Sequence, residues 1–319
     1  MKRLILLSLV ALVFVACSSD ENGEKKGVES SEAPCNADDA ACFESKCAKN
    51  DNFSCLRLAE LTYWGQGGAA KDEKKAISIM QERCESGYAF ACEKIADFYL
   101  FGDANIAVNK DEARKYYEKS SVLYRKACDE NYAAACYRLG YLHLYGSENF
   151  FGNMSIEKDL NKTVSYYDKS CALDYKLACR NLGNFYRKGL SVEKSASKAR
   201  ELFDKACGMD RELCIWIGDR YKFDAKDYET SRIYYEKSCN QGFEWGCDDL
   251  GMMYFSGLGV AKDDKKAAEY FTKACELDKM GFVCYHIAVQ YKETGDLTTA
   301  KAYNEKACKL GHKRGCGGL

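Results

Sequence analysis

Cysteine is the chemically distinctive residue of this chain, since 19 of its 319 residues are cysteines. So many thiols are typical of an oxidising compartment, where they form disulfides. Two antiparallel helices joined by a short turn can bring two cysteines within bonding distance, so we expect each pair to join the end of one helix to the start of the next. We therefore predict nine local disulfides, whose partners lie seven to nine positions apart: Cys35/Cys42, Cys47/Cys55, Cys84/Cys92, Cys128/Cys136, Cys171/Cys179, Cys207/Cys214, Cys239/Cys247, Cys275/Cys284 and Cys308/Cys316.

Zinc binding is the alternative use of so many cysteines. Structural zinc sites commonly contain closely spaced Cys-x-x-Cys ligands, and this spacing does not occur in the sequence. The histidines His143, His286 and His312 are scattered and form no ligand motif. His143 takes a position that carries tyrosine in most repeats, which favours a packing role over a catalytic one. We predict no metal and no cofactor.

Two Ser-x-x-Lys motifs, Ser191/Lys194 and Ser195/Lys198, have the spacing of the serine β-lactamase nucleophile. That chemistry requires serine and lysine on one face of a helix, whereas both motifs fall in a predicted loop. Neither Ser-Asp-Asn nor Lys-Thr-Gly follows them, and no His-Glu-x-x-His, Walker loop or Gly-x-Ser-x-Gly motif is present. We assign no catalytic residue.

A repeated helix pair must position the cysteines. Each opening cysteine begins a predicted first helix, with a branched apolar residue three positions later and Gly or Ala at four, where two helices can approach closely. Tyrosine at position seven and glycine at position ten after the opening cysteine recur in most repeats. A second helix follows, for example over residues 264–275, where Ala267, Phe271 and Cys275 share one side. The opening cysteines are Cys55, Cys92, Cys136, Cys179, Cys214, Cys247 and Cys284.

The repetition predicts an all-α fold, a solenoid of α/α helix pairs, because one such pair is too small to bury its own apolar face. The single proline of the chain agrees with helix throughout. The domains we expect are a signal peptide over residues 1–16, a flexible linker over 17–34 and the solenoid over 35–319. Within the solenoid, residues 35–54 form a partial cap and 55–316 about seven repeats. The repetition does not extend to Cys35 and Cys42, which lie outside the full repeats, so their pairing stays open.

The segment from Leu250 to Cys275 reads L-G-x-x-Y-x-x-G-x-G-V-x-K-D-x-x-K-A-x-x-Y-x-x-K-A-C almost unbroken, and it resembles the Sel1-like repeat, a relative of the tetratricopeptide repeat. The cysteine pair in every unit is similar to the Helicobacter cysteine-rich protein family, over about residues 47–316. The resemblance implies a right-handed, disulfide-stapled superhelix. It also implies an alternative function as a weak β-lactamase or penicillin-binding protein, with a β-lactam or peptidoglycan-like ligand.

The N-terminus has the layout of a secretory signal, with Lys2 and Arg3 before an apolar run from Leu4 to Val15. The residues up to Cys17 (Phe-Val-Ala-Cys) resemble a bacterial lipobox, which implies that the Cys17 thiol carries diacylglycerol. That use of Cys17 leaves an even number of cysteines. An ordinary cleaved signal is the alternative. We expect an exported protein, lipid-anchored in the bacterial envelope, in the outer membrane facing the periplasm or the cell surface.

The function that we expect is binding of an envelope protein or peptide. The net charge of −1 gives no indication of a nucleic-acid partner. Positions one, five and eight after the opening cysteine form a stripe beside the packing positions, which tetratricopeptide-like arrays present on a binding surface. Packing between repeats, a solvated stripe, or a site on the Phe150-Phe151 loop are the alternatives. The predicted ligand groove consists of Tyr137, Tyr141, Leu144, Arg180, Asn184 and Arg187.

Overall fold

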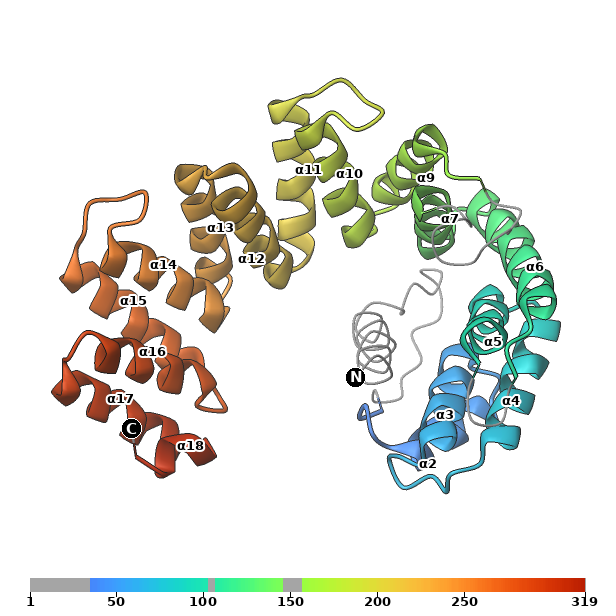
Figure 1. The fold of residues 1–319 in the computed structure, drawn as a ribbon, viewed down its shortest axis with the longest axis horizontal. Coiled ribbons are helices and arrows are strands. Elements are labelled where there is room, and N and C mark those ends of the chain that lie inside the picture. Colours follow the sequence, from blue (N-terminus) through green and yellow to red (C-terminus); the bar gives the residue numbers. More distant parts are fainter. Residues whose placement is uncertain (1–34, 103–106, 146–156, 319) are drawn as a thin grey trace. The chain divides into compact units, whose positions relative to one another are not determined.

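The computed structural model describes residues 35–102, 107–145 and 157–318, and over these residues it contains helices and no β-strand (Figure 1). First and second helices alternate along the chain, which confirms the predicted α/α solenoid class. The first helices are α3 (Asn52–Trp64), α5 (Ala89–Phe101), α7 (Ala133–Tyr145), α10 (Lys176–Lys188), α12 (Arg211–Asp219), α14 (Glu244–Ser256) and α16 (Phe282–Glu293). The second helices are α4 (Glu73–Glu85), α6 (Lys110–Asp129), α9 (Leu160–Ala172), α11 (Ala196–Met209), α13 (Tyr228–Asn240), α15 (Asp264–Leu277) and α17 (Leu297–Lys309).

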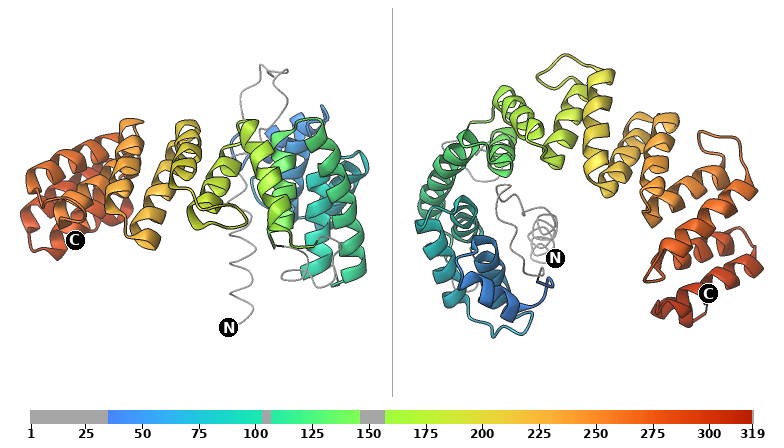
Figure 2. Two further views of the ribbon diagram at one scale, coloured as in Figure 1. Left: turned by 90° about the horizontal axis from the view of Figure 1, so that it is seen from above. Right: turned by 180° about the vertical axis from the view of Figure 1, so that it is seen from behind.

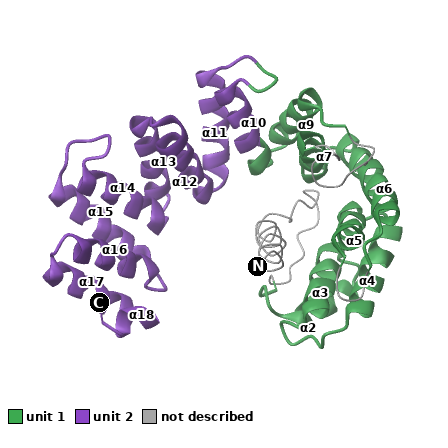
Figure 3. Cartoon of the chain, in the orientation of Figure 1, with its two compact units in different colours: residues 1–178, 190–192 green, residues 179–189, 193–319 purple. Residues whose placement is uncertain are grey.

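Two short helices flank these pairs, α2 (Ala40–Cys47) before the first repeat and α18 (Lys313–Cys316) after the last. The chain divides into two compact units (Figure 3). Unit 1 contains residues 1–178 and 190–192, and unit 2 contains residues 179–189 and 193–319. Within each unit, helices that follow one another in the sequence pack side by side, as the further views also show (Figure 2). None of the helices in the described ranges is long and apolar enough to cross a membrane.

The second helices begin at a residue whose side chain caps them. An aspartate, asparagine or serine oxygen accepts a backbone N–H of the first helical turn, which would otherwise have no partner. This explains why a Lys-Asp sequence often precedes the second helix, since the aspartate is the cap. The capping residues are Asp72, Asn109, Asp159, Ser195, Asp227, Asp263 and Asp296.

The small residue at position four is required by an aromatic ring of the facing second helix. A Cβ atom added at Gly251 would lie 2.6 Å from Cδ1 of Phe271, and one at Gly140 would lie 2.6 Å from Cδ1 of Tyr167. Gly218 has the same relation to Tyr235. The predicted close approach is present, but the ring of the second helix, more than its backbone, occupies the space that a side chain would take.

Position seven packs by ring stacking. Its tyrosine stacks on a tyrosine of the second helix in four repeats, with ring centroids 5.6–5.9 Å apart and interplanar angles of 5–10°: Tyr99/Tyr116, Tyr221/Tyr234, Tyr254/Tyr270 and Tyr291/Tyr303. His143 stacks on Tyr166 in the same way, at 5.7 Å and 9°. Burial lowers the pKa of His143. The histidine is therefore a packing residue, as the sequence predicts.

Most disulfides join the end of one helix to the start of the next. Eight of the nine predicted pairs are bonded with Cα–Cα distances of 4.5–5.7 Å, within the usual range for a disulfide. Cys171 and Cys179 each take part in a disulfide as well. The bridges of the repeats therefore fix the turns between successive helix pairs.

The first disulfide, between Cys35 and Cys42, departs from this arrangement. The structure bonds the two residues, with a Cα–Cα distance of 5.7 Å, and so decides the pairing that the repeats left open. The expectation that every pair joins the ends of two successive helices is wrong for Cys42. This cysteine lies in the first turn of α2, and Cys35 lies in the non-helical residues before that helix.

The reason for the different placement of Cys42 is that α2 is a cap and not the second helix of a full repeat. The backbone N–H of Cys42 donates to the Asp39 side chain at 3.0 Å, which caps α2. The disulfide and the cap therefore act together at the start of this helix. Cys42 is only partly buried, whereas Cys55 in the first full repeat is fully buried.

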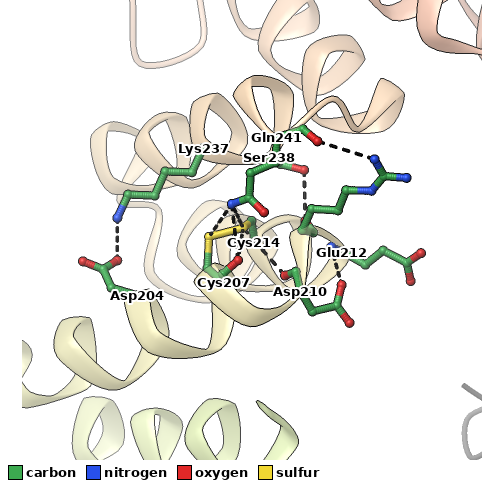
Figure 4. Close-up of a disulfide and its surroundings, with 9 residues drawn as sticks. Asp204, Cys207, Asp210, Glu212, Cys214, Lys237, Ser238 and Gln241 are labelled. Carbon is green, nitrogen blue, oxygen red and sulfur yellow. Dashed lines mark hydrogen bonds and ion pairs between the residues drawn. A yellow bond between two sulfur atoms is a disulfide. The ribbon is translucent and has the colours of Figure 1, made fainter. Parts of the chain in front are cut away.

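The C-terminal end of α13 covers the disulfide Cys207/Cys214 at the start of α12 (Figure 4). The side-chain amide nitrogen of Gln241 donates to the carbonyl oxygen of Cys207 at 3.3 Å and lies 3.5 Å from Sγ of Cys214. The Ser238 hydroxyl donates to the carbonyl oxygen of Arg211 at 3.0 Å. These polar contacts tie the two ends of one helix pair together.

Two repeats depart from the common length. Helix α6 has 20 residues where most second helices have 13, so it is longer by about two turns. The fifth repeat has Asp224 where most other repeats have a glycine, and α12 continues as the π-helix η1 (Arg220–Ala225). The chain leaves η1 through Lys226, whose φ is 54°. A π-helical turn changes the direction in which the following side chains point, and such turns are frequent at functional sites.

Candidate functional site

The first helices have one side that points away from most of the contacts with the second helices. Positions zero, three, four and seven after the opening cysteine pack against second helices, so positions one, two, five and six lie on the opposite side. We call this side, in each unit, the first-helix face. It carries charged and aromatic side chains that are partly buried rather than fully solvated. Side chains so arranged can bind a ligand without disturbing the core.

In unit 1 the face contains a cluster of tyrosines. The ring centroid of Tyr137 lies 6.5 Å from that of Tyr141 and 5.0 Å from that of Tyr175. Tyr141 continues the cluster to Tyr145, at 4.7 Å. Burial raises the pKa of Tyr141 to about 12. The predicted groove residues Tyr137 and Tyr141 are therefore adjacent, and Leu144 beside them is partly buried.

The same face of unit 1 holds paired charges with little exposure. Glu60 lies 2.5 Å from Nη1 of Arg57 and 3.8 Å from Nζ of Lys94, which is only 5% exposed. Glu93 lies 3.7 Å from Nη1 of Arg138. A buried charge is tolerated only when it is paired in this way. The unit 1 face therefore combines a tyrosine cluster with a balanced set of charges.

In unit 2 the predicted arginines meet an indole that sequence reasoning missed. The Arg180 guanidinium lies 4.6 Å from the Trp216 ring centroid, and the Arg220 guanidinium lies 5.5 Å from the same centroid. Two arginines thus contact one tryptophan in a cation–π arrangement. The contact connects α10 to α12 and η1.

The predicted pair Asn184 and Arg187 belongs to the same surface. The Asn184 side-chain oxygen accepts from Nη2 of Arg187 at 2.9 Å, and Asp224 pairs with that arginine at 3.1 Å. Asp224 also lies 3.5 Å from Nη1 of Arg220. One carboxylate on η1 therefore orients two arginines.

The predicted groove residues fall into the two units. Tyr137, Tyr141 and Leu144 lie in unit 1, whereas Arg180, Asn184 and Arg187 lie in unit 2, and each set forms part of its own unit's face. The stripe at positions one, five and eight omitted positions two and six. Helix geometry puts these beside one and five, so a wider stripe would have found Trp216 and Arg220.

A second cluster on the unit 2 face is acidic. Asp248, 3% exposed, lies 2.7 Å from Nδ1 of His286, and Asp249 lies 3.8 Å from Nζ of Lys222. Burial raises the pKa of Asp249 to about 7 and raises that of Asp248. The hydrogen bond to Asp248 raises the pKa of His286. The exposed Trp245 ring lies 6.1 Å from the His286 ring.

The Ser-x-x-Lys motifs have structural roles. The Ser195 hydroxyl accepts from the backbone N–H of Lys198 and caps α11, while Nζ of Lys198 bonds to Glu201 at 2.8 Å. Ser191 lies before α11, and its hydroxyl bonds to Asn161. In neither motif do the described contacts join the serine hydroxyl to the lysine amine, as an activated nucleophile requires.

The other candidates from the sequence are a metal site, the lipidation residue and an aromatic loop. Within residues 35–102, 107–145 and 157–318, no group of three or more His, Cys, Asp or Glu side chains is arranged to hold a metal ion. The predicted lipidation residue Cys17 and the Phe150-Phe151 loop lie outside the described residues. The first-helix faces are therefore the candidate site.

Comparison with known proteins places this arrangement in a family. The sequence is 29% identical over 241 residues to cytochrome c oxidase assembly factor 7 of the frog Xenopus tropicalis, which covers 75% of this chain and 85% of that protein. The solved Sel1 repeat protein from Oxalobacter formigenes shares 20% identity with a TM-score of 0.49, over 75% of this chain and 93% of that one.

A solved protective antigen of uropathogenic Escherichia coli, described as having an SLR fold, also has 20% identity and a TM-score of 0.49. The match covers 88% of this chain but only 58% of the antigen. The Sel1 repeat model matches residues 53–88, 89–121, 133–175, 176–210, 217–243 and 246–279. Since these segments span most of the helix pairs described above, the chain belongs to the Sel1 repeat family.

Proposed function

We propose that this Sel1 repeat scaffold binds an extended segment of another protein along its first-helix faces. The observation that carries the proposal is the contact of the Trp216 ring with both the Arg180 and the Arg220 guanidinium groups. One side of Trp216 packs against the core of unit 2, and all three side chains are held partly buried on one surface. Arginine and tryptophan in such settings are the residues that contribute most to protein–protein binding.

The tyrosine cluster of unit 1 supports the same function. Tyrosine provides a large contact area with few rotatable bonds, so it loses little entropy when a partner binds. Tyr141 and Tyr145 lie at the accessible end of the cluster, since Tyr145 is 39% exposed whereas Tyr137 is 9% exposed. The frog relative is named an assembly factor, a name that agrees with a scaffold acting on other proteins.

We further propose that the protein is exported and lipid-anchored through Cys17, and that it acts in the bacterial cell envelope. The signal-like leader and the odd cysteine before the first local pair support this location. Disulfides in every repeat suit an oxidising compartment. We also propose that the protein belongs to the Helicobacter cysteine-rich family, because the same cysteine pairs resemble that family.

Site-specific photocrosslinking tests the binding surface. A benzophenone amino acid is introduced at Phe223, which is 64% exposed on η1, or at the control position Met209, which is 37% exposed at the end of α11. We expect a defined partner to crosslink from position 223 and not from position 209. Equal crosslinking from both positions would contradict the proposal.

The identified partner then provides a quantitative test. Trp216→Ala and the double variant Tyr141→Ala with Arg187→Ala should each weaken binding of the purified partner by about tenfold or more, as loss of a main contact residue does. Circular dichroism checks that the helices remain intact. Unaltered affinity with intact helices would place the site elsewhere, and the Phe150-Phe151 loop is then the next candidate.

A further inference from the structure

Each first helix of unit 1 that belongs to a full repeat ends in an exposed aromatic residue. Trp64 ends α3, Phe101 ends α5 and Tyr145 ends α7, and their exposed fractions are 40%, 44% and 39%. All three stand nine positions after the opening cysteine of their repeat. Nine residues make about two and a half turns of an α-helix, so position nine lies opposite the cysteine, on the first-helix face. We call these three residues the aromatic row.

The aromatic row is a property of unit 1. In unit 2, position nine carries a different kind of residue in each repeat: Lys188, Phe223, Ser256 and Glu293. Single exposed apolar residues are common on protein surfaces, whereas a regular group of them indicates an interaction site. The recurrence of an aromatic residue in three successive repeats is such a group.

Contacts within the helix hold two of the three rings. The Trp64 ring centroid lies 5.0 Å from that of Tyr63, which is buried, and the Tyr145 ring centroid lies 4.7 Å from that of Tyr141. A side chain that is already held in place loses less conformational entropy when it binds a partner. Trp64 can in addition donate the indole N–H to a carbonyl oxygen of a ligand.

Side-chain contacts show that the first helices of unit 1 are neighbours. The ring centroids of Tyr63 on α3 and Phe98 on α5 lie 4.7 Å apart. The Arg138 guanidinium on α7 lies 4.6 Å from the ring centroid of Phe90, at the start of α5. Packed helices lie about 8–10 Å apart, and each residue of the row ends its helix, so successive rings should also be about 8–10 Å apart.

This step matches one turn of a polyproline II helix. Such a helix has three residues per turn and rises about 3.1 Å per residue, so one turn is about 9.3 Å long. A β-strand returns to the same face every two residues, about 6.6 Å, which is too short for the step. Grooves lined by aromatic residues bind proline-rich segments in the polyproline II conformation, which lose little entropy because they are already ordered.

We infer that unit 1 binds a proline-rich segment of another protein in the polyproline II conformation, with prolines three residues apart over Trp64, Phe101 and Tyr145. The inference rests on the proposed function and names the chemical class of the partner. The row is continuous with the proposed binding surface, because Tyr141 lies one turn before Tyr145 on α7. The chain itself has a single proline, so neither its own N-terminal segment nor a second copy can supply the ligand.

The charged groups on the same face suit an uncharged segment. Glu60 lies 2.5 Å from Nη1 of Arg57 and 3.8 Å from Nζ of Lys94, and Glu93 lies 3.7 Å from Nη1 of Arg138. Because these charges are already paired, a charged ligand would have to compete with an existing ion pair. A proline-rich segment has uncharged side chains over the row and leaves the pairs intact.

Selection from a phage-displayed library of random dodecapeptides tests the inference on the purified, oxidised full-length chain. We expect the enriched peptides to contain prolines at intervals of three residues. A fluorescently labelled synthetic peptide with the pattern P-x-x-P-x-x-P then serves as the probe for affinity, measured by fluorescence anisotropy. A peptide of the same composition with prolines at intervals of two residues should bind about tenfold more weakly.

Variants of the row provide the second measurement. Trp64→Ala, Phe101→Ala and Tyr145→Ala should each weaken binding of the probe by about tenfold, as loss of a main contact residue does. Phe223→Ala is the matched control for Phe101→Ala, because it removes the same side chain from the same repeat position in unit 2, where it is 64% exposed. It should bind the probe as the parent does. Circular dichroism checks that the helices of each variant remain intact.

The outcomes separate this inference from the proposed function. Enriched peptides without the three-residue proline interval, for example with apolar residues at the intervals of an amphipathic helix, would overturn the inference and leave peptide binding standing. Equal affinity of the probe for the parent and for the three row variants would also overturn it. Photocrosslinking from position 223 reports on the proposed function separately, so a crosslinked partner without enrichment of proline-spaced peptides would count against this inference alone.

Discussion

At the scale of single residues, the chain separates packing from recognition by position in the repeat. Positions four and seven pair a small residue or a ring with an aromatic side chain of the second helix, as Gly251 does with Phe271. The opposite face keeps charged groups such as Asp248 and Asp249 partly or fully buried. Substitutions at the two kinds of position should therefore have different consequences.

Gly251→Ala should destabilise unit 2 by about 1–3 kcal/mol, the cost of overpacking a dense core. The added methyl group would lie 2.6 Å from Cδ1 of Phe271. Gly208→Ala is the matched control, because no atom lies within 4 Å of its added Cβ and its φ is not positive. It should be neutral or stabilise α11 by up to about 1 kcal/mol. Urea unfolding measures both, and equal effects would contradict this packing role.

The pH dependence of the free energy of unfolding should reveal the raised pKa of Asp249. Its pKa is raised from 3.8 to about 7 in the folded chain. The folded state therefore retains a proton that the unfolded state releases. The contribution to stability is complete below pH 3.8 and is lost as the pH rises to about 7.

Asp249→Asn should remove this loss of stability at rising pH, because asparagine does not titrate. Its urea midpoint should exceed that of the parent above pH 7 and approach it toward pH 3.8, the two ends of the Asp249 window. Measuring the difference between variant and parent cancels the contributions of titrating groups in unit 1, such as Asp97, whose pKa burial raises to about 6. A difference that is constant with pH would contradict the raised pKa.

At the scale of elements, the helix pair is the unit of structure, and its ends are fixed covalently and by capping. A disulfide holds the turn before most first helices, and a side-chain cap opens each second helix. The Ser-x-x-Lys motif at Ser195 is one of these caps. The catalytic resemblance of this motif therefore has a structural explanation.

Ser195→Ala should lower the stability of unit 2 by about 1 kcal/mol through loss of the helix cap. Ser195→Asp should retain the stability, since aspartate caps helices equally well, although it removes the hydroxyl. Neither variant should change any turnover of a chromogenic β-lactam. Saturable turnover that is abolished in both variants, or by Ser191→Ala, would show a serine hydrolase instead.

Removing one buried bridge should destabilise its helix pair. Cys239→Ser with Cys247→Ser opens a loop between positions eight apart, which costs roughly 2.5 kcal/mol in the chain-entropy model. The bridge Cys308/Cys316 is the control, because Cys316 ends the last helix and is exposed, whereas Cys239 and Cys247 are buried. Its loss should fray α18 only. Hydrogen exchange distinguishes destabilisation of a helix pair from fraying of α18. Destabilisation of the whole array on loss of the Cys308/Cys316 bridge would contradict the local role of that bridge.

At the scale of the whole molecule, stability is a sum of neighbouring contacts, because each helix packs mainly against those next to it in sequence. Every described cysteine is disulfide-bonded, so the array combines a modest core per repeat with a covalent link between repeats. Such a chain suits an oxidising compartment, and Cys17 is the cysteine left over from the local pairs.

Lipidation of Cys17 is testable on the intact protein. Cys17→Ser should release the protein from the membrane fraction and abolish incorporation of labelled acyl chains, because the thiol is the atom that would be alkylated. Ser18→Ala is a neighbouring control that should remain anchored. A Cys17→Ser protein that still sediments with membranes and still carries acyl chains would refute the anchor.

The class of fold followed from the sequence alone. Cysteine, Leu-Gly and tyrosine recur at constant spacing, for example at Cys247, Gly251 and Tyr254, and a helix period of 3.6 residues converts such spacing into faces. Disulfide partners in the repeats were equally local. Since both features depend on residues close together in the chain, they needed no knowledge of the tertiary structure.

The first bridge shows where the repeat pattern stops being informative. Cys42 has no counterpart at the same position of a full repeat, so periodicity could neither fix its pairing with Cys35 nor place it in the first turn of α2. The structure decided both, because the position of a cap depends on the helix pair against which it packs.

The surface that joins several repeats was likewise decided by the tertiary structure. Arg180 and Arg187 could be placed on a stripe from sequence, but Trp216 and Asp224 meet them only through packing between repeats. Asp224 replaces the terminating glycine, and only the structure shows that a π-helix then aligns it with two arginines. Contacts between residues some 30–40 positions apart depend on how helices pack, which local periodicity does not encode.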